Sequence, residues 1–237
     1  MPLRIGIDIS SVGGTANPLI SADLSWLSTS GLGVTGSSVD SWDPATGTSA
    51  TLSQTGTARP TRTATVFGSS YGITFDGSND YLKTATHPIS SAAGSLGIVF
   101  KTGSSVTGPM VLVSQGCLLT TNDYWNLGIA SDGRLFFEYS NSLGAINIKG
   151  SSILEASTVY YAFISHDGTD TYLELNGTEE NPLVNTTPTV TAQHWLGEVE
   201  GATVRLTLGA VETSGGVSQF FNGSIGGVWI WNTDITA

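Results

Sequence analysis

The 237-residue chain is poor in charge and has no long apolar run. Charged residues make up 11% of it, with 8 Lys and Arg against 19 Asp and Glu, so the net charge is −11. Proteins that bind nucleic acid need a basic surface, and so do proteins that adhere to anionic membranes. The acidic balance therefore argues against both partners. No apolar run approaches the roughly 18 residues that would predict a membrane span.

Cysteine is nearly absent, and this excludes a disulfide within the chain. The single Cys117 lies in the apolar segment 111–119, where a small buried side chain is expected. The first ten residues, MPLRIGIDIS, have neither the apolar core nor the cleavage site of a secretory signal. We therefore expect synthesis in a cytoplasm, without export through a signal peptide.

Several kinds of catalytic site are also missing. The sequence has no G-x-S-x-G nucleophile elbow, and no Gly-rich loop followed by the lysine of a phosphate site. The three histidines are scattered, without Cys or Glu at metal-ligand spacing. Glu198 and Glu200 alternate as the two carboxylates of a retaining glycosidase could, but the glycines on either side favour a solvated turn. We expect the protein not to be an enzyme.

The sequence is instead rich in glycine, serine, threonine and short alternating segments. Residues 96–102 and 110–115 are predicted strands, and 203–211 alternates strictly between apolar and polar positions. In the last apolar segment, Trp229 and Trp231 share one side. With no long amphipathic helical pattern, the predicted class is all-β, an antiparallel two-sheet β-sandwich.

Two hairpins are expected within this sandwich. In residues 124–140, Asp132-Gly133 is typical of a two-residue type I′ turn. That turn would pair Leu127 with Glu138, leaving apolar side chains on both faces and the hairpin largely covered. In residues 158–175, a loop at 167–170 would pair Ile164 with Leu173, which puts one apolar face in the core.

The N-terminal residues 1–22 are predicted to form an arm or linker before a domain at 23–237. Ile5, Ile7 and Ile9 alternate with small or polar residues, as in a strand, and a Gly/Ser/Asn/Pro stretch follows. This strand could be the first of the sandwich, or it could dock on a partner by adding an edge strand.

The segment TFDGSNDYL, residues 74–82, is a strand, a tight turn and a second strand. It resembles the "FDG-x-x-D-x-L" segment of laminin-G-like, concanavalin-A-like jelly-roll domains. An ordered series of further matches covers about residues 68–235. A leader like that found before such domains has Trp26-Leu27, Trp42-Asp43 and Arg59-Pro60-Thr61. The resemblance implies a concanavalin-A-like jelly roll, a fold that binds ligands more often than it transforms them.

The resemblance also suggests calcium, which is common at the loop tips of this fold. Asp76, Asn79 and Asp80 offer the hard oxygen ligands that calcium prefers. The same residue types form turns by bonding their own backbone, and we favour that interpretation. No cofactor is predicted, with calcium as the one candidate.

Four side chains are candidates for ligand binding because they lie in polar, Gly-flanked segments. Exposed Trp and Tyr rings stack on sugars or anchor protein interfaces. Burial in the core is the default expectation for a tryptophan, and exposure is the alternative that would make these residues a binding site. The candidates are Tyr124, Trp125, His194 and Trp195.

Three functions remain compatible with the sequence. Because the leader and jelly roll resemble bacteriophage structural proteins, the first is a virion protein: a capsid decoration, fibre or neck/tail component. Such a protein would bind other virion proteins and form a homo-oligomer. A host-surface glycan is a further candidate ligand. The alternative is a carbohydrate-binding module of a bacterial surface protein. A glycoside hydrolase or lyase, using Glu198 and Glu200, is the least favoured.

Overall fold

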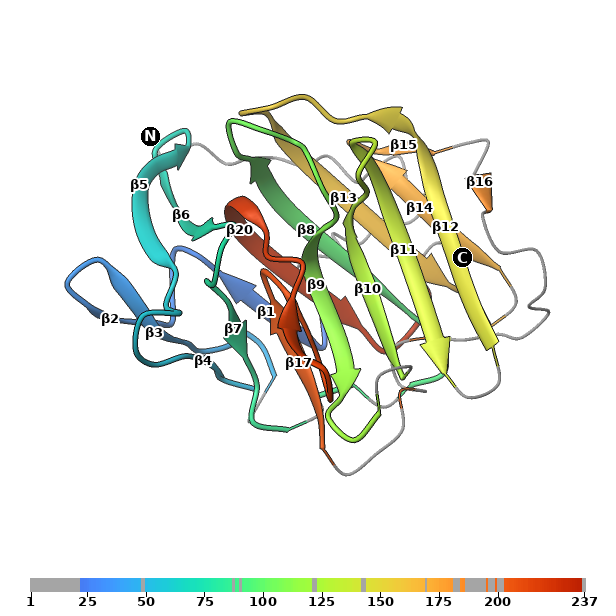
Figure 1. Ribbon diagram of the computed structural model, residues 1–237, viewed down its shortest axis with the longest axis horizontal. Helices are drawn as coiled ribbons and strands as arrows, with labels where there is room; N and C mark the ends of the chain where they lie inside the picture. The colour runs from blue at the N-terminus through green and yellow to red at the C-terminus, as the bar shows by residue number, and fades with distance from the viewer. Residues whose placement is uncertain are drawn as a thin grey trace.

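Two antiparallel sheets pack face to face in the computed structural model, which contains no helix among the residues it describes (Figure 1). The predicted antiparallel two-sheet β-sandwich is thereby confirmed. The described residues are 22–47, 50–86, 88–89, 91–120, 123–141, 144–168, 170–180, 184–185, 195, 199 and 203–235.

The back sheet is built around the long C-terminal strand. Its strands are β1 (Leu24–Leu27), β6 (Ser70–Asp76), β8 (Gly94–Thr102), β13 (Val159–His166), β14 (Thr171–Leu175), β15 (Thr178–Glu179) and β20 (Asn222–Trp231). They lie in the order β6–β20–β8–β13–β14–β15, and β1 pairs with β20 beyond the end of β6. The C-terminal strand is therefore central, and it ties the first described strand to the sandwich.

The front sheet has β10 at its centre. Its strands are β7 (Leu82–Lys83), β9 (Met110–Cys117), β10 (Tyr124–Ile129), β11 (Arg134–Asn141), β12 (Gly144–Ile153), β16 (Val184–Asn185) and β17 (Val204–Leu208). Their order is β7–β17–β9–β10–β11–β12–β16. Figure 1 shows β9 to β12 in front of β8 and β13.

Two smaller groups of strands complete the fold. The first, β2 (Leu32–Thr35), β3 (Ser38–Trp42), β4 (Leu52–Ser53) and β5 (Thr61–Phe67), joins β6 of the back sheet to β7 of the front sheet along one side. The second is a hairpin of β18 (Val211–Thr213) and β19 (Gly216–Ser218), which follows β17 directly.

The core between the sheets is filled by the inward positions of alternating strands. On β20, Val228 and Ile230 belong to this core, whereas Trp229 and Trp231 pack on the other side of the strand with aromatic side chains of β13. The predicted alternation of this last strand is confirmed. Cys117 is also buried and has a free thiol, as expected.

The two hairpins test the predicted registers. In the pair β13–β14, Ile164 lies opposite Leu173, as predicted. In the pair β10–β11, the predicted pairing of Leu127 with Glu138 is wrong, because Leu127 lies opposite Phe137. The turn has one residue more than expected, since the Ala130 N–H bonds the Arg134 carbonyl and only Gly133 within the loop has positive φ.

This one-residue difference puts Tyr124, Asn126 and Glu138 on the same face of the hairpin. Trp125 and Leu127 of β10 now point into the core together with Phe137 of β11. Glu138 points away from the core and lies opposite Asn126. The inner face of the hairpin is therefore apolar, and Asn126 and Glu138 share its outer face with Phe136.

Candidate functional site

A row of polar side chains crosses the outer face of the front sheet. The registers place its members opposite one another on five neighbouring strands, β17, β9, β10, β11 and β12. The members of this polar row are Thr207, Ser114, Asn126, Glu138 and Asn147. Because neighbouring strands are about 4.8 Å apart, the row is about 20 Å long.

At the centre of the polar row, three side chains are joined by hydrogen bonds. Tyr124, two residues before Asn126 on β10, donates its hydroxyl to Glu138 Oε1 at 3.2 Å. The side-chain amide of Asn126 also bonds the Glu138 carboxylate. A carboxylate can only accept, so Asn126 directs its NH₂ group at Glu138 and its Oδ1 elsewhere.

Burial dominates the electrostatics of this contact. It raises the pKa of Glu138, against the opposing effect of the two bonds from Tyr124 and Asn126. Burial also raises the pKa of Tyr124 to about 12, with further contributions from the charge of Glu138 and from their hydrogen bond. Both groups are half-buried and so remain partly open to solvent. The pair thus holds a carboxylate in a partly desolvated position.

Several oxygens of the polar row have no partner among the described residues. They are Asn126 Oδ1, Asn147 Oδ1 and Thr207 Oγ1. A buried polar atom without a partner costs about 1–3 kcal/mol, so such atoms usually mark a place where water or a ligand bonds. We call Tyr124, Asn126, Glu138 and Asn147 the acceptor cluster, because its unpartnered buried atoms are oxygens, which accept hydrogen bonds.

The hairpin β18–β19 borders the acceptor cluster on one side by folding over β9. Ser114 donates its hydroxyl to the Ala210 carbonyl at 2.8 Å, and the Glu212 carbonyl passes so close to Gly116 that a Cβ there would collide with it. Lys83 Nζ, 2.7 Å from Glu212 Oε1, fixes the hairpin to the sheet. The hairpin therefore forms one wall beside the polar row.

An apolar contact closes one end of the same face. Val211 of the hairpin packs on Val111 and Phe136, and all three side chains are buried. The ring of Phe136 lies over Gly128, where a Cβ would collide with it. The face is therefore apolar at this end and polar along the acceptor cluster.

Comparison with known proteins identifies the family. Residues 76–237 match the family model described as the Concanavalin A-like lectin/glucanases superfamily. The chain belongs to this superfamily. The laminin-G-like, concanavalin-A-like resemblance seen in the sequence is thereby confirmed. No curated protein sequence matches the chain.

Solved structures share the jelly roll of this superfamily. The Ruminococcus gnavus IT-sialidase CBM40 bound to alpha2,3 sialyllactose matches with a TM-score of 0.57 and 19% identity, over 69% of this chain and 90% of that chain. The K499G mutant of NanB sialidase from Streptococcus pneumoniae matches with a TM-score of 0.54 and 14% identity, over 69% of this chain and 26% of that chain. The native heptameric SAP-like pentraxin from Limulus polyphemus matches with a TM-score of 0.51 and 15% identity, over 69% of this chain and 76% of that chain. At these identities the likeness shows the fold.

Of the four ligand-binding candidates predicted from the sequence, one lies in the acceptor cluster of this superfamily domain. That residue is Tyr124. Trp125 and Trp195 are 0% exposed, as the default expectation of core burial has it, so neither can offer a ring to a sugar and both fall out as ligand-binding candidates. Trp125 points inward with its alternating neighbours, and Trp195 stacks on His166 with ring centres 6.1 Å apart. His194 lies outside the described residues.

The sequence did not single out Asn126, Glu138 and Asn147. Each is an ordinary polar residue of a strand, and they become a cluster only through the pairing of three strands. One available signal was the alternation of β10 and β11. Matching their apolar faces would have placed Glu138 beside Asn126.

The predicted calcium ligands are engaged in their own turn. Asp76 Oδ1 accepts bonds from the N–H groups of Ser78, Asn79 and Asp80 at 2.8, 3.0 and 3.3 Å, and Asp80 Oδ2 accepts from the Asp76 N–H at 3.0 Å. Burial and then the charge of Asp76 raise the pKa of Asp80 to about 6. Turn formation accounts for these residues, and calcium binding stays a prediction. In the described part of the chain, no group of three or more His, Cys, Asp or Glu could hold a metal ion.

Other predicted residues lie outside the described ranges. They are the arm positions Ile5, Ile7 and Ile9 and the alternative catalytic pair Glu198 and Glu200. The boundary between an arm at 1–22 and a domain at 23–237 stays a prediction. Within the described ranges, no helix is long and apolar enough to cross a membrane.

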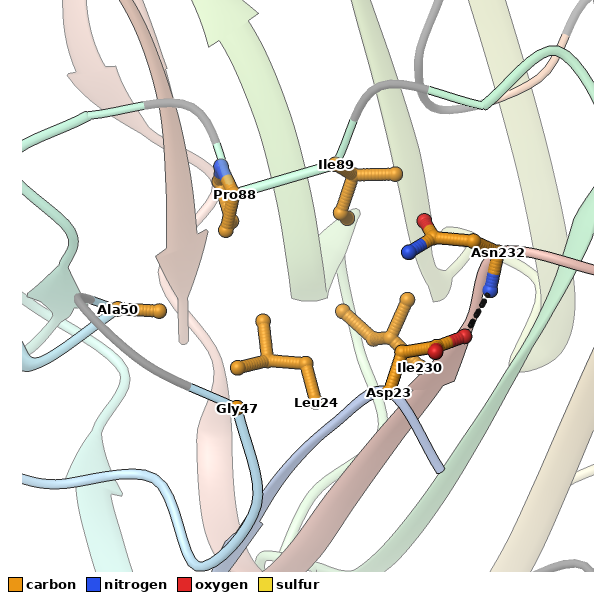
Figure 2. Close-up of a pocket in the computed structure, with 8 residues that line it drawn as sticks. All are labelled: Asp23, Leu24, Gly47, Ala50, Pro88, Ile89, Ile230 and Asn232. Carbon is orange, nitrogen blue, oxygen red and sulfur yellow. Dashed lines mark hydrogen bonds between the residues drawn. The ribbon is translucent and has the colours of Figure 1, made fainter. Parts of the chain in front are cut away.

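A small cavity lies near the start of β1 and the end of β20 (Figure 2). Leu24, Ile89 and Ile230 give it an apolar lining, and at its rim the Asp23 carboxylate accepts a 2.7 Å bond from the Asn232 N–H. Its volume is about 90 Å³, whereas sites for small molecules have about 300–1,000 Å³. The cavity is too small for a sugar.

Proposed function

We propose that the protein is a carbohydrate-binding module whose ligand lies across the acceptor cluster. The observation that carries this proposal is the unpartnered Oδ1 of Asn126 beside the half-buried Tyr124–Glu138 pair. Sugars present many hydroxyl groups, which can donate to such oxygens, and the ring of Tyr124 adds an apolar surface for a pyranose. The sialyllactose-bound CBM40 supports the proposal as a protein of the same fold that holds a glycan.

Binding is favoured over glycan cleavage by the composition of the polar row. Retaining glycosidases need two carboxyl groups about 5 Å apart, and inverting ones need a pair about 6.5–9.5 Å apart. The polar row, all of whose members are described, holds one carboxylate, Glu138. We therefore propose a non-catalytic role.

The carbohydrate-binding alternative is better supported than the virion role that we favoured from the sequence. The relatives named above are sialidase domains and a pentraxin, and none of them is a virion protein. A place on a bacterial cell surface, facing external glycans, fits this function. The pentraxin of similar fold is heptameric, and homo-oligomerisation stays part of the proposal.

A printed glycan array, followed by calorimetric titration of the strongest ligand, tests the function. Glu138→Ala removes the carboxylate from the acceptor cluster and should weaken binding about tenfold or more, since a hydrogen bond to a charged group contributes about 1.5–3 kcal/mol. Glu174→Ala is the matched control: Glu174 is a half-buried carboxylate on the back sheet, whose pKa burial also raises.

Two results would refute the proposed function. One is a wild-type protein that binds no glycan on the array. The other is an equal loss of affinity in Glu138→Ala and Glu174→Ala, because that would place the ligand away from the acceptor cluster.

A further inference from the structure

The buried side-chain atoms of the acceptor cluster that lack a partner are oxygens, Asn126 Oδ1 and Asn147 Oδ1. The Tyr124 hydroxyl donates to Glu138, and so does the Asn126 amide. The Glu138 carboxylate keeps further lone pairs that can accept. A ligand group that bonds these oxygens must therefore donate.

The basic side chains of this face are engaged elsewhere. Lys83 and Arg205 lie 2.7 and 3.6 Å from Glu212 Oε1, at the hairpin wall. Arg134 and Lys149 lie 3.9 and 3.2 Å from Asp132 Oδ2, beside the β10–β11 turn. These two groups flank the acceptor cluster, and they hold other carboxylates rather than Glu138.

Glu138 is thus a half-buried carboxylate whose partners are a hydroxyl and an amide. Its half-buried position removes part of the solvation that the charged form has in water, and this burial raises its pKa. A cation or a donor brought by the ligand would supply that missing stabilisation. A second carboxylate brought to the same place would be repelled, and the net charge of −11 would add to the repulsion at long range.

We infer that the acceptor cluster selects glycans that present hydroxyl or protonated amine groups to Glu138, and that it discriminates against sugars that bring a carboxylate there. Amino sugars fit best, because a protonated amine has three N–H groups and a positive charge for the oxygens of Glu138, Asn126 and Asn147. This inference rests on the proposed function. It also separates this chain from the sialyllactose-bound CBM40 of similar fold.

The test uses paired glycans that share a backbone and differ in the charged group they present, an amine in one pair and a carboxylate in the other. Two comparisons on the intact protein are sufficient: tri-N-acetylchitotriose against its de-N-acetylated trimer, and lactose against 3′-sialyllactose. Array sets of the same design extend both comparisons to other backbones. For wild type, the amine form should bind at least tenfold more tightly than the N-acetyl form, and the sialylated form more weakly than its neutral parent.

Glu138→Gln isolates the charge, since it keeps the size of the side chain. The variant should lose the amine preference about tenfold, while Glu174→Gln keeps it at the same ionic strength. Thermal unfolding of both variants shows that each remains folded.

Two outcomes overturn the inference while leaving the proposed function in place: tighter wild-type binding of the sialylated forms, or an unchanged amine preference in Glu138→Gln. Absence of binding to every glycan refutes the proposed function and this inference with it.

Discussion

Tyr124 and Glu138, on neighbouring strands of the front sheet, are joined by a 3.2 Å hydrogen bond in which the tyrosine hydroxyl donates to the carboxylate. The bond crosses the strands diagonally, because Tyr124 lies opposite Ser140 and Glu138 lies opposite Asn126. It holds the phenol ring and the carboxylate as one unit. A ligand on this face therefore meets a pre-arranged pair.

The first prediction concerns the pKa of Glu138. The bonds from Tyr124 and Asn126 lower this pKa against the raising effect of burial. Tyr124→Phe removes one of the two donors, so the pKa of Glu138 should rise further above its ordinary value. A ¹³C NMR titration of labelled glutamate carboxyl groups measures it. Tyr172→Phe, on the back sheet, is the control, and an unchanged Glu138 pKa in Tyr124→Phe would show that the bond is absent in solution.

A second prediction concerns stability against pH at Asp80. This side chain is 7% exposed, and its pKa is about 6 in the folded protein against 3.8 as the ordinary value. Between about pH 4 and pH 6 the unfolded chain has lost the proton of Asp80 while the folded chain still holds it. The free energy of unfolding therefore falls as the pH rises through this range, and it levels off above about pH 6. A shift of about two pKa units corresponds to about 3 kcal/mol at most.

Asp80→Asn should therefore stabilise the protein at pH 7.5 but not at pH 4. The amide oxygen can still accept from the Asp76 N–H, so the turn is kept. Urea unfolding at the two pH values measures the difference. Asn79→Ser, at the exposed tip of the same turn, should have no pH-dependent effect. A stabilisation of equal size at both pH values would contradict the predicted proton linkage.

A third prediction concerns Gly209, which turns the chain from β17 towards the hairpin β18–β19. Its φ is +82°, and a Cβ there would collide with the ring of Phe75. Gly209→Ala should cost about 2–4 kcal/mol of unfolding free energy, since it combines a left-handed backbone with overpacking. Gly36 has a φ of +64° and open space around it, so Gly36→Ala should cost only about 1–2 kcal/mol. Denaturant unfolding of both variants is the measurement, and equal costs would contradict this account.

The sequence predicted the fold better than it predicted the site. Alternation assigned the inward and outward sides of β17 and β20, and it gave the correct register of the hairpin β13–β14. These successes share a cause. Each segment has one apolar face that must be buried, which specifies the register of the strand.

The site was harder to predict, for two physical reasons. Asp132-Gly133 indicated a two-residue turn, but the turn has one residue more. The predicted register was therefore shifted by one residue, and it put Glu138 on the same face as Leu127 instead of Asn126. The polar row also draws on strands as distant in sequence as β9 and β17, whose relative register no local pattern specifies. The polar residues next to Trp125 in the sequence did not indicate whether its ring is buried. Its burial follows from its inward position on β10.

The location of the bound glycan tests the central claim most directly. In a ¹⁵N NMR titration of the assigned protein with the strongest glycan from the array, the largest amide shifts should map to β10, β11 and β12 around Asn126, Glu138 and Asn147. Glu138→Ala should reduce those shifts at equal ligand concentration. Shifts centred on the cavity beside Asp23 and Asn232, or on the outer side of the back sheet around Trp229, would contradict the claim.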